Sequence, residues 1–169
     1  MPAPTVRSFR ETDAEQVNRI AVCAFGQYQS LVSDWPAMSA RLAQMSALQD
    51  GSEIVVADLA GKVAGAVAYV PPGRPKAAQF DQSWPIIRML VVDPASRGLG
   101  VGRALTEACI ARARRDQSPV IALHTSPIMT VALPMYLRMG FRHLRDLPLM
   151  HGVPYAVYLK RLEARDPER

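Results

Sequence analysis

The stretch that decides the fold is Met89–Asp116, MLVVDPASRGLGVGRALTEACIARARRD. An apolar run ends at Asp93-Pro94, three glycines follow at alternate positions from Gly98 to Gly102, and apolar residues then recur at helical spacing. This order predicts a buried strand, a tight loop and a helix. Glycines at the start of a helix let a ligand approach the unpaired amide groups there, and those groups favour an anion. The stretch therefore predicts an anion-binding loop.

Two common phosphate loops do not fit these glycines. A Walker loop requires Lys and then Ser or Thr after its last glycine, but Arg103 and Ala104 follow Gly102. A dinucleotide fingerprint counted from Gly98 has Arg103 at its third glycine position, and five residues separate Val92 from Gly98. A nucleotide is therefore disfavoured as the ligand.

A third pattern accounts for the whole loop. Residues 92–102 read V-x-P-x-x-R-G-x-G-x-G, and residues 129–141, MTVALPMYLRMGF, form a second block. Together they resemble the R-x-x-G-x-G and N-x-x-A-x-x-L-Y-x-x-x-G-F segments of the GCN5-related N-acetyltransferases, the GNAT superfamily. Met129 and Met135 stand where that family usually has Asn and Leu. The order of the expected elements also matches the family along nearly the whole chain.

The resemblance implies acetyl-coenzyme A as cosubstrate and no metal. Its pyrophosphate would lie against the glycine loop, and the strand before the loop would offer backbone groups to the pantetheine arm and the thioester oxygen. The residues implied to bind it are Leu90, Val91, Val92, Arg97, Gly98, Leu99, Gly100, Val101, Gly102 and Arg103.

Catalytic residues are implied less completely. Tyr136 matches the family's tyrosine and is expected to act as the general acid that protonates the departing thiolate. Many relatives carry an acidic base on the strand before the loop, but strand 86–92 offers only Arg88 and Met89 there. His124, at the end of the apolar run VIALHT, is the candidate general base, because its ordinary pKa is suitable.

Other residues remain candidates for the general base and for the lining of the acceptor pocket. Asp34, Tyr28 and Asp81 lie in segments where the family forms that pocket. The aromatic side chains of the same two segments could clasp an apolar or planar acceptor; they are Tyr28, Trp35, Phe80 and Trp84.

The rest of the chain predicts a mixed sheet with helices on both faces. We expect a strand and helix near the N-terminus, a second helix over 35–49, a hairpin joined across Leu59–Lys62, and a loop of about fifteen residues over 71–85 that contains four prolines. Strands and helices then alternate to the end. The fold class is α/β: a sheet of about six to seven strands, splayed at strand 4 as the resemblance implies.

Length and composition bound the remaining possibilities. We expect one N-acetyltransferase domain over 1–162, with 163–169 as a loose tail. The net charge of +5 lacks the dense basic run of a nucleic-acid surface, and no apolar run reaches membrane-spanning length. No nucleic acid or membrane partner is expected, and a cytoplasmic protein with Cys23 and Cys109 both buried and reduced is indicated.

Three functions are consistent with these patterns. The first is direct transfer of an acetyl group to a primary amine of a small molecule in a ternary complex, without an acyl-enzyme. The second is acetylation of a peptide or protein amino terminus, which an open groove would favour. The third is a coenzyme A-binding sensor without catalysis, which the missing strand carboxylate keeps open. The family also makes a homodimer possible.

Overall fold

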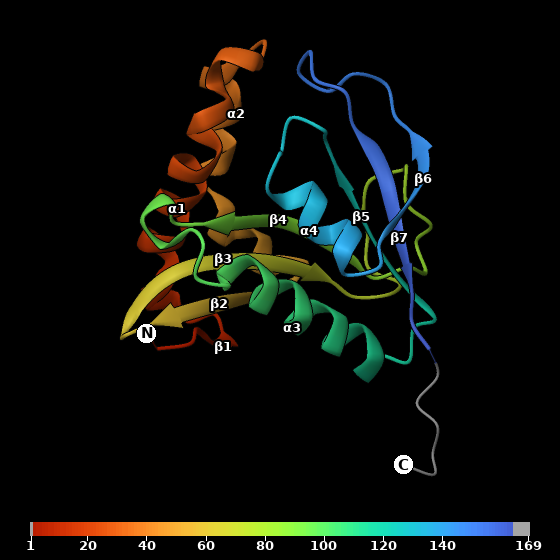
Figure 1. Cartoon of the computed structure of the whole chain (residues 1–169), viewed down its shortest axis with the longest axis horizontal. Coiled ribbons are helices and arrows are strands. Elements are labelled where there is room, and N and C mark those ends of the chain that lie inside the picture. The colour runs from red at the N-terminus through yellow and green to blue at the C-terminus, as the bar shows by residue number, and fades with distance from the viewer. Residues whose placement is uncertain (1, 164–169) are drawn as a thin grey trace.

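A computed structural model describes residues 2–163, which form a seven-stranded sheet in the order β1-β2-β3-β4-β5-β7-β6 (Figure 1). The strands are β1 (Thr5–Ser8), β2 (Glu53–Leu59), β3 (Lys62–Val70), β4 (Ile86–Val92), β5 (Val120–Thr125), β6 (Arg142–Asp146) and β7 (Ala156–Arg161). Only β4 and β5 run parallel, and all other neighbours are antiparallel. The predicted mixed sheet and α/β class are confirmed, whereas residues 164–169 of the predicted tail lie outside the described residues.

Helices cover both faces of the sheet. They are α1 (Ala14–Phe25), α2 (Trp35–Leu42), α3 (Val101–Arg115) and α4 (Ala132–Arg138), with 3-10 helices at Glu11–Asp13, Gly26–Leu31, Met45–Asp50 and Pro94–Ser96. One buried cluster joins α1 and α2 to one face, and another joins α3 and α4 to the opposite face. Inward-pointing residues alternate along the central strands, because successive side chains of a strand point to opposite faces.

The hairpin between β2 and β3 has the turn that its sequence predicts. Leu59 pairs with Lys62, and the two residues between them, Ala60 and Gly61, have φ of 52° and 82°. Two left-handed residues in a two-residue loop match the right-handed twist of the flanking strands. The hairpin prediction is confirmed.

The single helix expected over 35–49 is wrong in its second half. Helix α2 ends at Leu42, and a separate 3-10 helix follows over Met45–Asp50. In a continuous helix the Ser46 N–H would donate to the carbonyl of Leu42. Instead it donates to Oδ1 of Asn18 at 2.8 Å, while Asn18 Nδ2 donates to Ser46 Oγ at 2.9 Å. A side chain from α1 therefore ends the helix.

The expectation for the cysteines is half right. Cys109 is fully buried in the cluster beneath α3, but Cys23 is exposed. The buried face of α1 consists of Val17, Ile20, Ala21 and Ala24, and Cys23 lies outside this face. An apolar neighbourhood in sequence did not distinguish the two sides of the helix.

Gly65 lets β3 approach both β4 and α3. A Cβ at this position would lie 2.6 Å from the Val91 carbonyl oxygen and 2.9 Å from Val101 Cγ1. We predict that Gly65→Ala lowers the free energy of unfolding by about 2 kcal/mol, because a backbone atom cannot move aside cheaply. Thermal unfolding would measure this. Gly26→Ala is the control, since Gly26 has helical φ and open space around its Cα; equal loss in both variants would contradict the packing argument.

Candidate active site

The centre of the sheet opens between β4 and β5. These strands pair at one position, Ile86 with Ala122, and the Ala122 N–H donates to the Pro85 carbonyl at 3.1 Å. Beyond that point they diverge (Figure 1). Within residues 2–163 the following part of β4 has no strand partner on the β5 side. Backbone polar groups that are not used in a ladder remain available to a ligand.

A bulge lies in this same part of β4. Val91 pairs with Ala66 and Arg88 with Ala68, so that Met89 and Leu90 together face the single residue Val67. Met89 has φ of 54°, a left-handed conformation that costs free energy for a residue with a side chain. The bulge interrupts the ladder and redirects the backbone next to the predicted thioester-binding strand.

The glycine loop ends in an unobstructed helix start. Gly98 and Gly100 have φ of 78° and 81°, and no atom lies within 4 Å of a Cβ built at either. The first amide of the α3 ladder belongs to Ala104, which donates to the Gly100 carbonyl at 3.0 Å. The N–H groups of Val101 and Gly102 therefore precede the ladder and are free to bind an anion at the positive end of the helix dipole.

Other predicted cofactor residues lie around this loop in different ways. Arg97 and Arg103 are exposed, and Arg103 Nε bonds Glu107 Oε1 at 3.0 Å. A Cβ at Gly102 would make only ordinary van der Waals contacts with Leu90, Val92 and Met135, so packing leaves room for a side chain there. Leu99 is half-buried, and the side chains of Val91 and Val101 are buried on opposite faces of the sheet.

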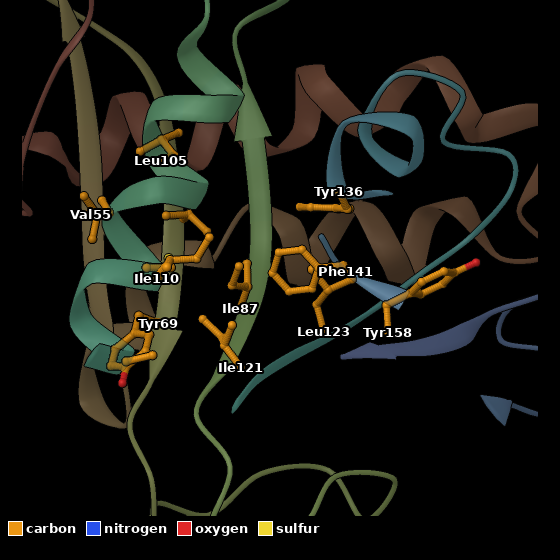
Figure 2. Packing of buried hydrophobic residues seen from close by; sticks show 14 of the residues in the cluster. Val55, Tyr69, Ile87, Leu105, Ile110, Ile121, Leu123, Tyr136, Phe141 and Tyr158 are labelled. Atoms are coloured by element: carbon orange, nitrogen blue, oxygen red, sulfur yellow. The ribbon is translucent and has the colours of Figure 1, made fainter. Parts of the chain in front are cut away.

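Tyr136 lies on α4 in the buried cluster beneath α3. Its ring makes an edge contact with Phe141 at a centroid distance of 5.6 Å, on the face that also carries Ile87 and Leu123 (Figure 2). Burial raises the pKa of Tyr136, and the neighbouring Cys109 thiol adds to the effect. The hydroxyl is therefore protonated at neutral pH and holds its proton more tightly than a free tyrosine does.

His124 lies on the other face of the sheet. It follows Ala122 by two residues on β5, and Ala122 belongs to the cluster on the face opposite Tyr136. Its Nδ1 lies 2.9 Å from Gln79 Nε2. Burial, and secondly the positive charge of Arg88, lower the pKa of His124 from its ordinary value of 6.5. The imidazole is therefore neutral at pH 7, and because Gln79 Nε2 can only donate, Nδ1 accepts this hydrogen bond and the imidazole Nε2 carries the ring proton.

The structure thus places the Tyr136 and His124 side chains on opposite faces of the sheet that opens between β4 and β5. Tyr136 shares its face with Leu123, and His124 shares its face with Ala122. The gap between β4 and β5 therefore connects the two faces of the sheet. The glycine loop follows directly after β4.

Comparison with known proteins decides the family. The sequence profile of the acetyltransferase (GNAT) family matches residues 15–141. The chain belongs to the GNAT family of acetyltransferases. It is 30% identical over 146 residues to a mycothiol acetyltransferase of Geodermatophilus obscurus, a match that covers 84% of this chain and 46% of that protein. A mycothiol acetyltransferase of Cellulomonas flavigena is 34% identical over 110 residues, 63% of this chain and 31% of that protein. The chain thus spans less than half the length of these curated relatives.

Solved structures share the GNAT fold. A histone acetyltransferase HPA2-related acetyltransferase of Corynebacterium glutamicum superposes with a TM-score of 0.73 at 25% identity, covering 95% of this chain and 97% of that one. The yncA protein of Salmonella typhimurium, solved with its cofactor acetyl-CoA, has a TM-score of 0.72 at 19% identity and covers 99% of both chains. At that identity the second likeness shows the fold alone.

A narrow apolar pocket lies beside His124 in this GNAT fold. Its cavity volume is about 10 Å³, roughly the space of one water molecule. Tyr155 connects the two, because it lines the pocket and makes an edge contact with His124 at 5.4 Å. The lining residues are Phe25, Tyr28, Val32, Met38, Ile128, Met129, Met150, His151, Val153 and Tyr155. Tyr155 was not among the residues expected to form the site; an aromatic residue directly after Pro154 and before a strand was its only signal.

The other residues considered for the acceptor side divide into two groups. Tyr28 lines the pocket, and burial raises its pKa while the charge of Arg97 opposes this. Asp34 instead accepts from the Ala37 N–H at the start of α2, and Asp81 accepts from the amide and hydroxyl of Ser83. The two carboxylates thus stabilise local backbone structure.

Two loop aromatics also have structural positions. Phe80 is 4% exposed in the cluster with Ile86 and Ala122, and Trp84 packs against the same cluster. Trp35 packs against the cluster under α1. Of the four aromatics expected to clasp an acceptor, the pocket lining includes only Tyr28 among the residues that the structure describes.

Cys109 has no nucleophilic character in this arrangement. It is fully buried, and burial raises its pKa to about 12. A thiol attacks as its thiolate, which is negligible at neutral pH with such a pKa. An acyl-cysteine at this position is therefore disfavoured.

None of the helices within residues 2–163 has the length and apolar character needed to cross a bilayer.

Proposed function

We propose that this chain transfers the acetyl group of acetyl-coenzyme A to a primary amine of a small molecule, by direct attack in a ternary complex. The observation that carries the proposal is the opening between β4 and β5, with the glycine loop after β4 and with Tyr136 and His124 on opposite faces. Membership of the GNAT family supports the same chemistry.

The glycine loop and strand β4 fit the cosubstrate. The free amides at the start of α3 and the exposed Arg97 would hold the pyrophosphate, and Leu90–Val92 would offer backbone groups to the pantetheine arm. Acetyl-coenzyme A supplies an acyl group already activated as a thioester. A backbone N–H next to the bulge at Met89 would donate to the carbonyl oxygen and stabilise its developing negative charge.

In this scheme one side chain on each face carries out one of the two proton transfers. His124, neutral at pH 7, takes a proton from the amine at Nδ1 once the Gln79 amide has moved off that nitrogen, as the amine nitrogen bonds to the acetyl carbon. The carbon–sulfur bond breaks, and Tyr136 on the other face gives its proton to the leaving thiolate. General acid and base groups of this kind each contribute about 100-fold or more to rate.

The pocket supports a small acceptor over a peptide terminus. Its volume of about 10 Å³ contrasts with the open groove that a peptide requires, and an acceptor would enter by displacing its unbranched, flexible methionine side chains. The relatives from Geodermatophilus obscurus and Cellulomonas flavigena are mycothiol acetyltransferases, and the mycothiol system is therefore one source of acceptors to test.

A thiol-release assay across a panel of amines tests the proposal. We expect free coenzyme A to appear only when a suitable amine is present, with the acetylated amine identified by mass spectrometry. Acetyl-coenzyme A that raises the melting temperature without any amine-dependent thiol release would instead support a coenzyme A sensor.

The pH dependence of the rate tests the role of His124. Because the pKa of His124 lies below its ordinary value of 6.5, protonation of the imidazole should add a further fall in rate below about pH 6.5 to the fall that protonation of the amine itself causes. We predict that His124→Gln lowers kcat/KM at pH 7.5 by about 100-fold or more and removes this further fall. His143→Gln is the control, since His143 is exposed on β6 and bonds Asp146. A His124→Gln variant with the original pH profile would exclude His124 as the base.

A further inference from the structure

Arg88 on β4 and His124 on β5 lie on the same face of the sheet, on the two sides of the opening. Ile86 and Ala122 are paired on parallel strands, so the next residues on the same face are Arg88 on β4 and His124 on β5. The pairing of Arg88 with Ala68, which belongs to the cluster under α1, gives the same face independently. The two side chains therefore flank the amine side of the opening.

The charge of Arg88 has no counter-ion on that side. Arg88 is exposed, and no carboxylate lies within 4.0 Å of its guanidinium among residues 2–163. Arg7 and Arg115, by contrast, bond Asp13 and Glu53 at 2.8 and 2.6 Å. Its charge nevertheless reaches the site, since it acts on His124. A free guanidinium next to a proton acceptor favours an anionic group in the bound molecule.

An arginine at this point would discriminate between acceptor molecules in two ways. Its planar guanidinium binds a carboxylate through two parallel hydrogen bonds. It also repels a second cation, which disfavours polyamines and favours the neutral form of an incoming amine. The neighbouring pocket is apolar and contains Phe25, Met38 and Met129, so it suits an apolar group of the acceptor.

We infer that the acceptor is an amine with a carboxylate close to its amino group and an apolar side chain, as in an apolar amino acid, and that Arg88 binds the carboxylate. The inference rests on the proposed acetyl transfer and names its substrate class. Arg88 is a binding residue in this scheme, and His124 remains the proton acceptor.

The test compares matched acids and amides. Thiol release is measured with L-methionine and L-phenylalanine, with the amides of both, and with spermidine, using the unaltered chain, Arg88→Gln and Arg161→Gln. Arg161 is the control because it is an exposed arginine on β7, paired with Val120 at the other end of β5 from His124. Melting temperatures of all three proteins check folding.

We expect the unaltered chain to prefer acids over amides by at least about tenfold in kcat/KM, the range of a charge-assisted bidentate contact. In Arg88→Gln this ratio should fall to about one, mainly through KM, whereas Arg161→Gln should keep it. Equal use of amides or spermidine by the unaltered chain, or an unchanged ratio in Arg88→Gln, overturns the inference while leaving acetyl transfer intact. Absence of thiol release with every amine overturns both.

Discussion

Tyr136→Phe should lower kcat by about 100-fold while leaving the affinity for acetyl-coenzyme A within about twofold. The substitution removes only the hydroxyl, so the ring keeps its edge contact with Phe141 and the cluster stays filled. Without the hydroxyl, the thiolate must leave unprotonated or take a proton from water. Steady-state thiol release and calorimetric titration with acetyl-coenzyme A measure the two quantities separately.

Tyr158→Phe is the matched control for this experiment. Tyr158 is a second buried tyrosine in the same cluster, but it lies on β7 and makes its edge contact with His143. Loss of its hydroxyl should change kcat by less than about twofold, since it has no role in the proton transfer. If both variants keep full activity, another group supplies the proton and the assignment of Tyr136 is wrong.

Gly100→Asp should weaken the binding of acetyl-coenzyme A by about 100-fold. Gly100 precedes the free amides of α3, and no atom lies within 4 Å of a Cβ at this position, so the new side chain has room. A carboxylate about 5 Å from a phosphate at a protein surface repels it by roughly 3 kcal/mol, which corresponds to this loss. The effect should decrease as salt is added.

Gly100→Asn separates charge from conformation. Asn and Asp have the same shape and both tolerate left-handed φ better than other residues, as the φ of 81° at Gly100 requires. Binding to the Asn variant should be only a few-fold weaker than to the unaltered chain. Equal losses with Asn and Asp would mean that the loop conformation matters and that no anion binds near Gly100.

The parts of the fold that local chemistry determines could be predicted from sequence. The turn at Gly61 and the glycine loop are examples, because glycine adopts positive φ without steric cost. The break after α2 could not be predicted, because Asn18 makes it from another helix through bonds to Ser46. The bulge at Met89 is similar: IIRMLVV has the composition of an ordinary buried strand, and only its neighbours force the left-handed residue.

In the candidate site, too, some residues could be predicted from local sequence and others could not. The glycine loop and Tyr136 follow from two short motifs that each lie in one segment. The acceptor pocket instead combines Met38, Met129 and Met150 from three distant segments, and apolar residues of this kind are indistinguishable from core residues in a sequence. The position of Arg88 opposite His124 depends on the register of β4 and β5, which the single pair Ile86 and Ala122 fixes.

A crystal structure of the chain with acetyl-coenzyme A tests the central claim most directly. We predict that the pyrophosphate lies against the amides that follow Gly100 and that the thioester lies between β4 and β5, with the sulfur toward Tyr136 and the carbonyl carbon open to the face of His124. A thioester bound outside this opening, or bound in it with the sulfur away from Tyr136, would contradict the account.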